Sequence, residues 1–218
     1  MLKAVIFDID GVLLDSQQAN IKFFQDLLEK AEYKRPSEKE ALQVLHLTMW
    51  DAIKALTKER SKPKLKVIWE MGHHVKYPVE LLKMPKDAKS VVKKLGKDYK
   101  LAIVTSRIEK GVEDFFQISN LRRQFRVVVS FEDYTNPKPH PEPLLVALKR
   151  LKMKPEEVVY IGDTESDIQS AKAAGIKIIM YSKSVHKSAD INVASFKEIP
   201  GAIAKINKKR LFFNSSSK

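Results

Sequence analysis

The sequence predicts an α/β protein in which a doubly wound parallel sheet is interrupted, after its first strand, by a small helical bundle. Over most of the chain, short apolar runs rich in β-branched residues alternate with segments of helical periodicity. Such alternation builds βαβ units, whose parallel strands are covered by helices on both faces. The stretch 16–84 is the exception, because it has helical periodicity and no convincing strand. A length of 218 residues suits one core with a smaller insert.

The expected strands are short apolar runs, as is typical of strands buried on both faces of a parallel sheet. They comprise residues 3–7, 100–104, 126–130, 157–161 and 177–181, with a weaker candidate at 191–193. Helical periods lie between them at 88–95, 110–118, 141–151 and 166–174. In an open sheet of this kind, the active site lies beyond the carboxyl ends of the strands.

The inserted segment is expected to fold into helices of its own. Apolar residues at helical spacing predict a first helix over 19–31, and a capping box of Ser37 and Glu40 opens a second helix that continues to Ile53. A third helix is expected around 67–71. This bundle would lie over the carboxyl ends of the strands, where a lid belongs. The expected division is a core of 1–15 and 85–208, a helical cap of 16–84, and a basic, polar C-terminal tail of 209–218.

The net charge of the chain indicates which classes of partner it can attract. Lys and Arg number 40 against 27 Asp and Glu, and the net charge of +13 attracts anionic partners of any kind. Because no basic stripe is interleaved with aromatic residues, nucleic acid is not favoured. The excess lysines form either a solvated surface or a polyanion site. No apolar run approaches the roughly 18 residues that span a bilayer, so no membrane partner is expected.

The absence of cysteine gives information about the cellular compartment in which the protein is expected. It excludes disulfides and thiolate metal sites and fits a reducing cytoplasm. The first residues are not expected to be a signal peptide, because Asp8 and Asp10 interrupt their apolar stretch. We therefore expect a cytoplasmic protein, either a monomer or a homodimer.

Two carboxylates follow the first expected strand. Asp8 and Asp10 come directly after the apolar run 4–7, and both point the same way because side chains alternate faces along a strand. Such a pair repels unless a cation or a shared proton relieves it. Gly11 permits the tight turn or close backbone approach that a site needs there. The arrangement indicates a metal site, a nucleophile beside an acid/base, or both, although a solvated acidic turn would explain the motif taken alone.

Two further polar signals follow strand ends. Thr105, Ser106 and Arg107 come after the run 101–104. A hydroxyl there commonly caps the next helix, but with the adjacent N–H groups it could also cradle an anion. Lys138 lies in a loop after the third expected strand, where prolines at 137, 139, 141 and 143 hold it stiffly. A surface lysine in a turn is the plain alternative.

The segment 162–167, with the sequence GDTESD, follows the fourth expected strand. Asp163 ends the strand and Asp167 starts the next helix. Helix capping explains one acidic residue, whereas two acids with a glycine suit a hard cation bound through oxygens. In total, four carboxylates, a hydroxyl and a lysine lie at the tips of four parallel strands. We therefore predict a hard-metal site that handles anions.

At these motifs the chain resembles the haloacid dehalogenase (HAD) superfamily, in the branch with a helical cap after the first motif. The resemblance rests on residues 8–16 (DIDGVLLDS), Thr105, Lys138-Pro139 and 162–167, in this order. It implies a Rossmann-like core and a phosphoric monoester hydrolase. The loop 136–143 is similar to that of phosphoglycolate phosphatases. The motif set also resembles sugar-phosphate phosphatases, β-phosphoglucomutases and small pyrophosphatases.

The resemblance implies a role for each acidic motif. Asp8 would be the nucleophile that forms an aspartyl-phosphate, and Asp10 would be the acid and base. Mg²⁺ would be held by the carboxylates of Asp8 and Asp163 and by the backbone carbonyl of Asp10. Asp167 would support the metal or orient Lys138. Lys138 would offset charge on the phosphoryl group.

Substrate contacts are also implied. Thr105 and Ser106, with nearby N–H groups, would hold phosphoryl oxygens. Arg107, one turn away, could hold a second anionic group of the substrate, with a surface ion pair as the alternative. In the cap, His46 and Thr48 are the candidate contacts.

The expected function follows from Asp10. Haloacid dehalogenases and phosphonate-cleaving relatives lack an aspartate at this position, so its presence favours phosphoryl transfer from oxygen. We expect a Mg²⁺-dependent phosphatase for a small phosphorylated metabolite, with 2-phosphoglycolate or a sugar phosphate first. The alternatives are a β-phosphoglucomutase-like phosphomutase, a pyrophosphatase, a phosphatase of nucleic-acid ends, and a non-enzymatic binding protein on the same fold.

Overall fold

The computed structural model describes residues 1–45 and 47–215, except for the side chains of 209–215. Two compact units make up the chain. The core unit comprises Met1–Leu14 and Met84–Lys218, and the helical unit comprises Asp15–Lys83. Among the helices of the described residues, none combines the length and the apolar character that crossing a bilayer requires.

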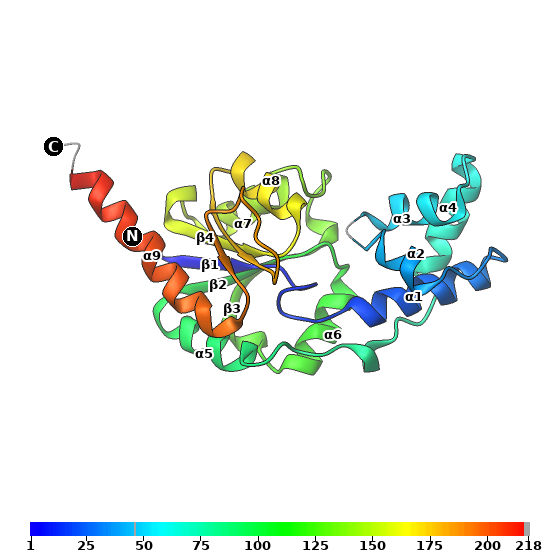
Figure 1. Cartoon of the computed structure of the whole chain (residues 1–218), viewed down its shortest axis with the longest axis horizontal. Helices are drawn as coiled ribbons and strands as arrows, with labels where there is room; N and C mark the ends of the chain where they lie inside the picture. Colours follow the sequence, from blue (N-terminus) through cyan, green and yellow to red (C-terminus); the bar gives the residue numbers. More distant parts are fainter. Residues whose placement is uncertain (46, 216–218) are drawn as a thin grey trace. The chain divides into compact units, whose positions relative to one another are not determined.

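The described part of the core unit is built on a six-stranded sheet of order β3-β2-β1-β4-β5-β6, in which every neighbouring pair is parallel (Figure 1). This confirms the predicted fold class. β1 lies between β2 and β4, so the carboxyl ends of these three strands are adjacent. Each predicted strand is found within one residue of its expected bounds. The strands are β1 (Ala4–Phe7), β2 (Lys100–Val104), β3 (Phe125–Val129), β4 (Val158–Gly162), β5 (Lys177–Tyr181) and β6 (Ile191–Val193).

Helices cover both faces of the sheet, as a doubly wound fold requires (Figure 1). α7 and α8 lie on one face, α5 and α6 lie on the other, and α9 packs beside α5. The elements are α5 (Ala88–Asp98), α6 (Glu109–Ser119), α7 (Glu142–Leu151), α8 (Glu165–Ala173) and α9 (Ile199–Ser215), with 3-10 turns η2 (Arg122–Gln124), η3 (Phe131–Asp133), η4 (Pro155–Glu157) and η5 (Phe196–Glu198).

The apolar spacing of the sequence explains why these elements pack as they do. In α5, the buried residues Ala88, Val91, Val92 and Leu95 recur at helical spacing and form one stripe. Strand residues are buried on both faces, and all four residues of β1 are inaccessible to solvent. The core therefore lies on both sides of a central strand whose carboxyl end leads into the acidic motif.

The C-terminal segment differs from its prediction. Residues 209–218 are predicted as a separate tail, but α9 continues as far as Ser215. The packed residues Ile199, Ala202 and Ile203 start this helix. Once a helix has started, extension by good helix formers such as lysine, arginine and leucine is favourable.

The helical unit has a core of its own. The apolar faces of its helices meet around Leu27, Ile53 and Leu65. The predicted capping box is confirmed, because the Ser37 hydroxyl accepts from the N–H of Glu40 and the Glu40 carboxylate accepts from the N–H of Ser37 at 2.7 Å. The elements are α1 (Gln17–Lys30), α2 (Glu38–Leu42), α3 (Met49–Thr57), α4 (Lys62–Gly72) and the turn η1 (Val79–Leu81).

The second helix of this unit also differs from its prediction. The sequence predicts one helix that continues to Ile53, whereas α2 ends at Leu42 and α3 begins at Met49. Thr48 is the reason for the new start, because its hydroxyl accepts the N–H of Asp51 at 3.2 Å. A threonine that caps a helix satisfies a terminal N–H that would otherwise lack a partner.

The two ends of the helical unit are paired. The N–H of Asp15 donates to the carbonyl of Lys83 at 2.8 Å, and the N–H of Lys83 donates to the carbonyl of Asp15 at 3.3 Å. This isolated antiparallel bridge brings the outgoing and returning chain segments together. The insertion of about 70 residues therefore interrupts the core at a single point.

Candidate active site

Asp8 is the first residue after β1 and lies at the carboxyl edge of the sheet. Its N–H donates to the carbonyl of Ile161 in β4 at 3.0 Å, which anchors its backbone. Its buried carboxylate accepts from the N–H of Ile9 and from Nζ of Lys138, each at 2.6 Å. Burial raises the pKa of Asp8 to about 7, although the charge of Lys138 opposes the rise.

Lys138 reaches this edge from the loop after β3. Its Nζ lies 2.6 Å from Asp8 Oδ2, 2.7 Å from Asp167 Oδ1 and 3.1 Å from the hydroxyl of Tyr160. Three acceptors thus match the three protons of the ammonium group. Burial acts to lower the pKa of Lys138, but the Asp167 and Asp8 carboxylates outweigh it and raise the pKa well above its usual range. Lys138 is a fixed positive charge at the centre of the site.

Side chains hold the loop that carries Lys138. The Glu142 carboxylate accepts from the N–H groups of Thr135 and Asn136, each at 2.9 Å. On the other side, the hydroxyl of Ser170 donates to the carbonyl of His140 at 2.9 Å. Prolines restrict the loop's backbone, and these bonds attach it to α7 and α8.

Asp167 is fully buried in the first turn of α8, where five donors surround it. Oδ1 accepts from Lys138 and from the Tyr160 hydroxyl, each at 2.7 Å. Oδ2 accepts from the N–H of Asp163 at 3.1 Å, and from the N–H and hydroxyl of Thr164 at 3.0 and 2.7 Å. Burial alone would raise the pKa of Asp167, but Lys138 and these hydrogen bonds lower it. Asp167 is therefore an ionised carboxylate whose acceptor capacity is used within the protein.

Asp163 follows β4 and has the opposite surroundings. In the part of the chain that the structure describes, its carboxylate accepts no hydrogen bond. Burial, and then the charges of Asp167 and Asp8, raise the pKa of Asp163 to about 8. Asp163 is half-buried, and a carboxylate largely shielded from water and without a donor is costly unless a cation compensates it.

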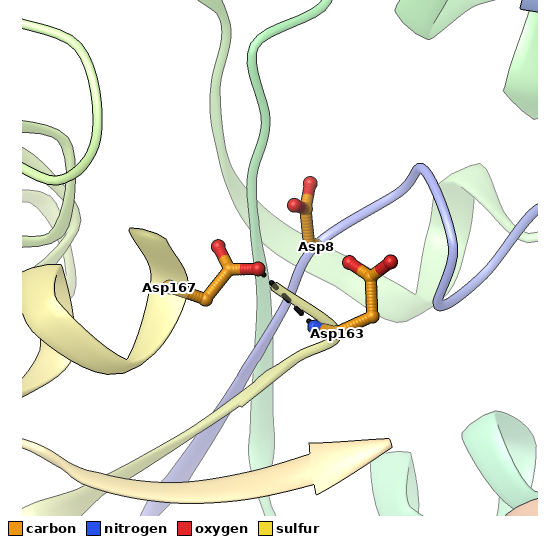
Figure 2. A group of neighbouring side chains, drawn as sticks. All are labelled: Asp8, Asp163 and Asp167. Atoms are coloured by element: carbon orange, nitrogen blue, oxygen red, sulfur yellow. Dashed lines mark hydrogen bonds between the residues drawn. The ribbon is translucent and has the colours of Figure 1, made fainter. Parts of the chain in front are cut away.

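The carboxyl groups of Asp8, Asp163 and Asp167 point toward one another (Figure 2), and one oxygen of each lies within 4.8 Å of the others. An all-oxygen donor set suits a hard divalent cation such as Mg²⁺. Asp8 and Asp163 have raised pKa values and gain most from a cation, whereas the oxygens of Asp167 are already taken. The residues present therefore fit a metal ion. The carboxylate of Asp10, predicted to contribute only its backbone carbonyl, is not part of this group.

Gly11 makes this cluster sterically feasible. It has φ +70, a conformation that disfavours side chains, and its N–H donates to the carbonyl of Leu14 at 2.8 Å. A Cβ atom at this position would overlap the carboxylate of Asp163. Both the turn and the approach of Asp163 therefore require glycine, as the sequence predicts.

Asp10 and Arg107 form a two-point ion pair. Nε and Nη2 of Arg107 donate to the two carboxylate oxygens of Asp10 at 2.8 and 2.7 Å. The Arg107 side chain is 9% exposed and that of Asp10 is 34% exposed. The sequence predicts that Arg107 meets a second anionic group of the substrate or forms a surface ion pair, and its partner in the structure is Asp10, the predicted acid/base.

Thr105 is buried at the end of β2 and turns the chain. Its N–H donates to the carbonyl of Val129 at 3.0 Å, and its hydroxyl accepts from the N–H of Arg107 at 3.2 Å. It is not the cap of the next helix, because α6 begins at Glu109. Ser106 beside it is exposed. The anion cradle predicted for these two residues stays a prediction.

The cap residues predicted to contact substrate lie in the helical unit. His46 falls outside the described residues. Thr48 caps α3 and its hydroxyl also donates to Asp51 at 2.7 Å, which explains its presence without a substrate. His73 and His74 are both exposed and follow the end of α4 at Gly72.

Tyr160 is the residue at this site that sequence reasoning missed. It lies in the middle of β4, and its hydroxyl contacts both Asp167 and Lys138. The available indication was the tyrosine hydroxyl, the one polar side-chain group in the apolar run VVYIG. Tyr160 lies two residues before Gly162 and therefore on the same side of the strand. Within one strand, a tyrosine that packs its ring cannot be told apart from one that also uses its hydroxyl.

The fold and the site define a class of α/β protein: a parallel sheet carries carboxylates at adjacent strand ends, with a buried lysine beside them and a carboxylate group that could hold a hard cation. The chain belongs to the haloacid dehalogenase-like hydrolases, because the model of this family matches residues 5–181. The resemblance inferred from the motifs is confirmed.

Individual relatives give the same picture. The chain is 30% identical to Pyrophosphatase PpaX of Bacillus pumilus over 182 residues, and this aligned stretch covers 81% of each chain. A solved HAD-superfamily hydrolase of Geobacter sulfurreducens is 28% identical, with a TM-score of 0.72 over 92% of this chain and 96% of that one. A β-phosphoglucomutase of Clostridium difficile shares the fold, with a TM-score of 0.81 at 18% identity over 97% of this chain and 100% of that one.

Proposed function

We propose that this chain is a Mg²⁺-dependent phosphatase that hydrolyses a small phosphorylated metabolite through an aspartyl-phosphate intermediate. The observation that carries the proposal is the bond of 2.6 Å between Lys138 and Asp8, beside the metal-competent Asp163. A carboxylate attacks an anionic phosphate only where nearby positive charge offsets the repulsion. Membership of a hydrolase family supports this chemistry.

Each residue then has a defined task. An oxygen of Asp8 bonds to phosphorus while the bond from phosphorus to the leaving oxygen breaks, and Asp10 gives that oxygen a proton. Asp10 next takes a proton from the water that cleaves the aspartyl-phosphate, and Asp8 is restored. Bound Mg²⁺, held by Asp8, Asp163 and the carbonyl of Asp10, supplies positive charge beside the transferred group.

The remaining groups position the phosphate. Lys138 offsets the charge of the phosphoryl group and of Asp8, and Asp167 orients Lys138. Thr105, Ser106 and nearby N–H groups hold the other phosphoryl oxygens. The helical unit serves as a cap, with His46 and Thr48 as its candidate contacts.

The substrate we place first is 2-phosphoglycolate, followed by sugar phosphates. The loop 136–143, which is similar to that of phosphoglycolate phosphatases, supports this order. Pyrophosphate is a further candidate, because a relative at 30% identity is named a pyrophosphatase. Both 2-phosphoglycolate and pyrophosphate carry a second anionic group besides the transferred phosphoryl group, and Arg107 beside Asp10 is the cation suited to meet it.

The test measures phosphate release from p-nitrophenyl phosphate with Mg²⁺ and with a chelator, in wild type, Asp8→Asn and Asp15→Asn. Asp15 is exposed and has no assigned role, so its variant controls for loss of one carboxylate in the same segment. We expect turnover only with metal, in wild type and Asp15→Asn. Asp8→Asn turnover close to that of Asp15→Asn would contradict the mechanism.

A substrate panel then separates the alternatives. We expect the highest kcat/KM for 2-phosphoglycolate or pyrophosphate rather than for phosphate monoesters whose organic part carries no charge. Isomerisation of a hexose phosphate without net phosphate release would instead indicate a phosphomutase. Salt-sensitive release of phosphate from oligonucleotide ends would assign the net charge of +13 to a nucleic-acid substrate.

A further inference from the structure

A fully buried tyrosine hydroxyl contacts both Lys138, which binds the candidate nucleophile Asp8, and Asp167, the other carboxylate partner of Lys138. The hydroxyl of Tyr160 donates to Oδ1 of Asp167 at 2.7 Å and accepts from Nζ of Lys138 at 3.1 Å. The same oxygen of Asp167 accepts from Lys138 at 2.7 Å. Three polar atoms thus form a closed triangle behind Asp8.

We propose that Tyr160 is a positioning residue that fixes the direction in which Lys138 points at Asp8. This inference rests on the proposed role of Asp8 as nucleophile. Tyr160 does not touch the reacting atoms, and it acts through Lys138 and Asp167.

The hydroxyl is not required for packing. The ring belongs to the apolar cluster of the α7 and α8 face, with Ile6, Ile168 and Ile178. A phenylalanine would fill the same space, and burying a hydroxyl is unfavourable unless it is hydrogen-bonded. Burial and the neighbouring Asp167 raise the pKa of Tyr160 well above its usual range, so the hydroxyl stays protonated and keeps donating to that carboxylate.

The geometry shows what the hydroxyl adds. Without it, Lys138 keeps two carboxylate partners and has no third acceptor to define its rotation. Asp167 loses one of the two donors to Oδ1 and becomes freer to turn. We therefore expect the ammonium group to move away from its alignment with Asp8, while the substrate contacts remain in place.

The experiment is Tyr160→Phe, which removes one oxygen and keeps the ring. The ring face lies 5.8 Å from Nζ of Lys138, so the cation–π contact is retained as well. Tyr33→Phe is the matched control, because it also removes a bond from a tyrosine hydroxyl to a carboxylate, that of Glu59 at 2.9 Å. Tyr33 belongs to the helical unit and has no assigned role.

For Tyr160→Phe we expect kcat to fall about tenfold while KM stays within about twofold, as befits a group that acts mainly in the transition state. The control should keep both parameters. In a double-mutant cycle with Asp167→Asn, the second substitution should add little, because both act through Lys138. A merely structural role would lower Tm and leave kcat of the folded fraction unchanged.

A crystal structure of Tyr160→Phe keeps the test independent of the proposed function. We expect Nζ of Lys138 to shift relative to Asp8 while both carboxylates remain its partners. Where wild type turns over substrate, a kcat of Tyr160→Phe within about twofold of wild type overturns the inference. Where wild type shows no turnover, the proposed function fails, and an unmoved Lys138 in the variant overturns the positioning role on its own.

Discussion

Lys138 and Asp8 are 130 positions apart in the chain, yet Nζ of Lys138 lies 2.6 Å from Oδ2 of Asp8. β3 and β1 bring the two residues to the same edge, because all strands of the sheet run in one direction. The lysine is 6% exposed and Asp8 is 9% exposed, so the pair is shielded from solvent. Because this pair is shielded, we can predict how changes in charge, side-chain size and pH at the site affect stability and activity.

Lys138→Met should abolish turnover and destabilise the fold. Methionine has similar bulk, but it leaves the carboxylates of Asp8 and Asp167 buried without their cation. Removing one partner of a buried pair typically costs about 3 kcal/mol or more. Chemical denaturation measures the loss, and Lys93→Met, at an exposed lysine of α5, is the control. Equal stability of the two variants would show that Lys138 does not neutralise the buried carboxylates.

Gly11→Ala should weaken metal binding more than it weakens the fold. The new methyl group overlaps the Asp163 carboxylate and also strains a backbone with φ +70. Gly175→Ala separates the two effects, because Gly175 has φ +72 but a Cβ there would lie 3.5 Å from its nearest neighbour. Each strained residue should cost about 1 kcal/mol of stability. Isothermal titration with Mg²⁺ should show lost affinity for Gly11→Ala alone, and equal affinity in both variants would contradict the steric argument.

Arg107→Lys should reduce the preference for substrates with a second anionic group. Lysine keeps the charge but cannot make the two-point pair seen with Asp10. We compare kcat/KM for 2-phosphoglycolate with that for 2-hydroxyethyl phosphate, in which a hydroxymethyl group replaces the carboxylate, and expect the ratio to fall about tenfold. Arg126→Lys, at an exposed arginine of β3, should leave the ratio unchanged. A parallel loss for both substrates would assign Arg107 to Asp10 alone.

The stability of the metal-free protein should fall as pH rises from about 4 to about 8. The folded-state pKa values of Asp8, about 7, and Asp163, about 8, lie above the ordinary value of 3.8. The folded state therefore binds more protons than the unfolded state in this range, and the free energy of unfolding decreases with pH. Mg²⁺ binds the ionised carboxylates, so its stabilising effect should grow over the same range.

Tm measured from pH 5 to 9, with chelator and with Mg²⁺, checks this prediction. Asp163→Asn removes one of the two groups, and its Tm in chelator should fall less steeply with pH than that of wild type. Identical slopes in wild type and Asp163→Asn would show that Asp163 is already ionised in the folded protein.

The agreement between prediction and structure follows from the kind of information involved. Strand and helix positions depend on local periodicity, so the strands were found within one residue of their expected bounds. The capping box at Ser37 is equally local and was also found. The break before α3 was missed because Leu42, Leu45 and Ile53 continue the helical spacing across it, and the hydroxyl of Thr48 gave no stronger signal than any surface threonine.

What the sequence determined by itself was the fold class and the set of acidic and basic residues at the strand ends. These follow from apolar alternation and from motifs that are contiguous in the chain. Tertiary structure decided which atoms meet. Among the described residues it gave Asp167 five donors and Asp163 none, it paired Asp10 with Arg107, and it placed the Tyr160 hydroxyl against Lys138. The physical reason is that burial and hydrogen-bond partners depend on neighbours from distant segments, and they turn carboxylates of one type into groups with opposite pKa shifts.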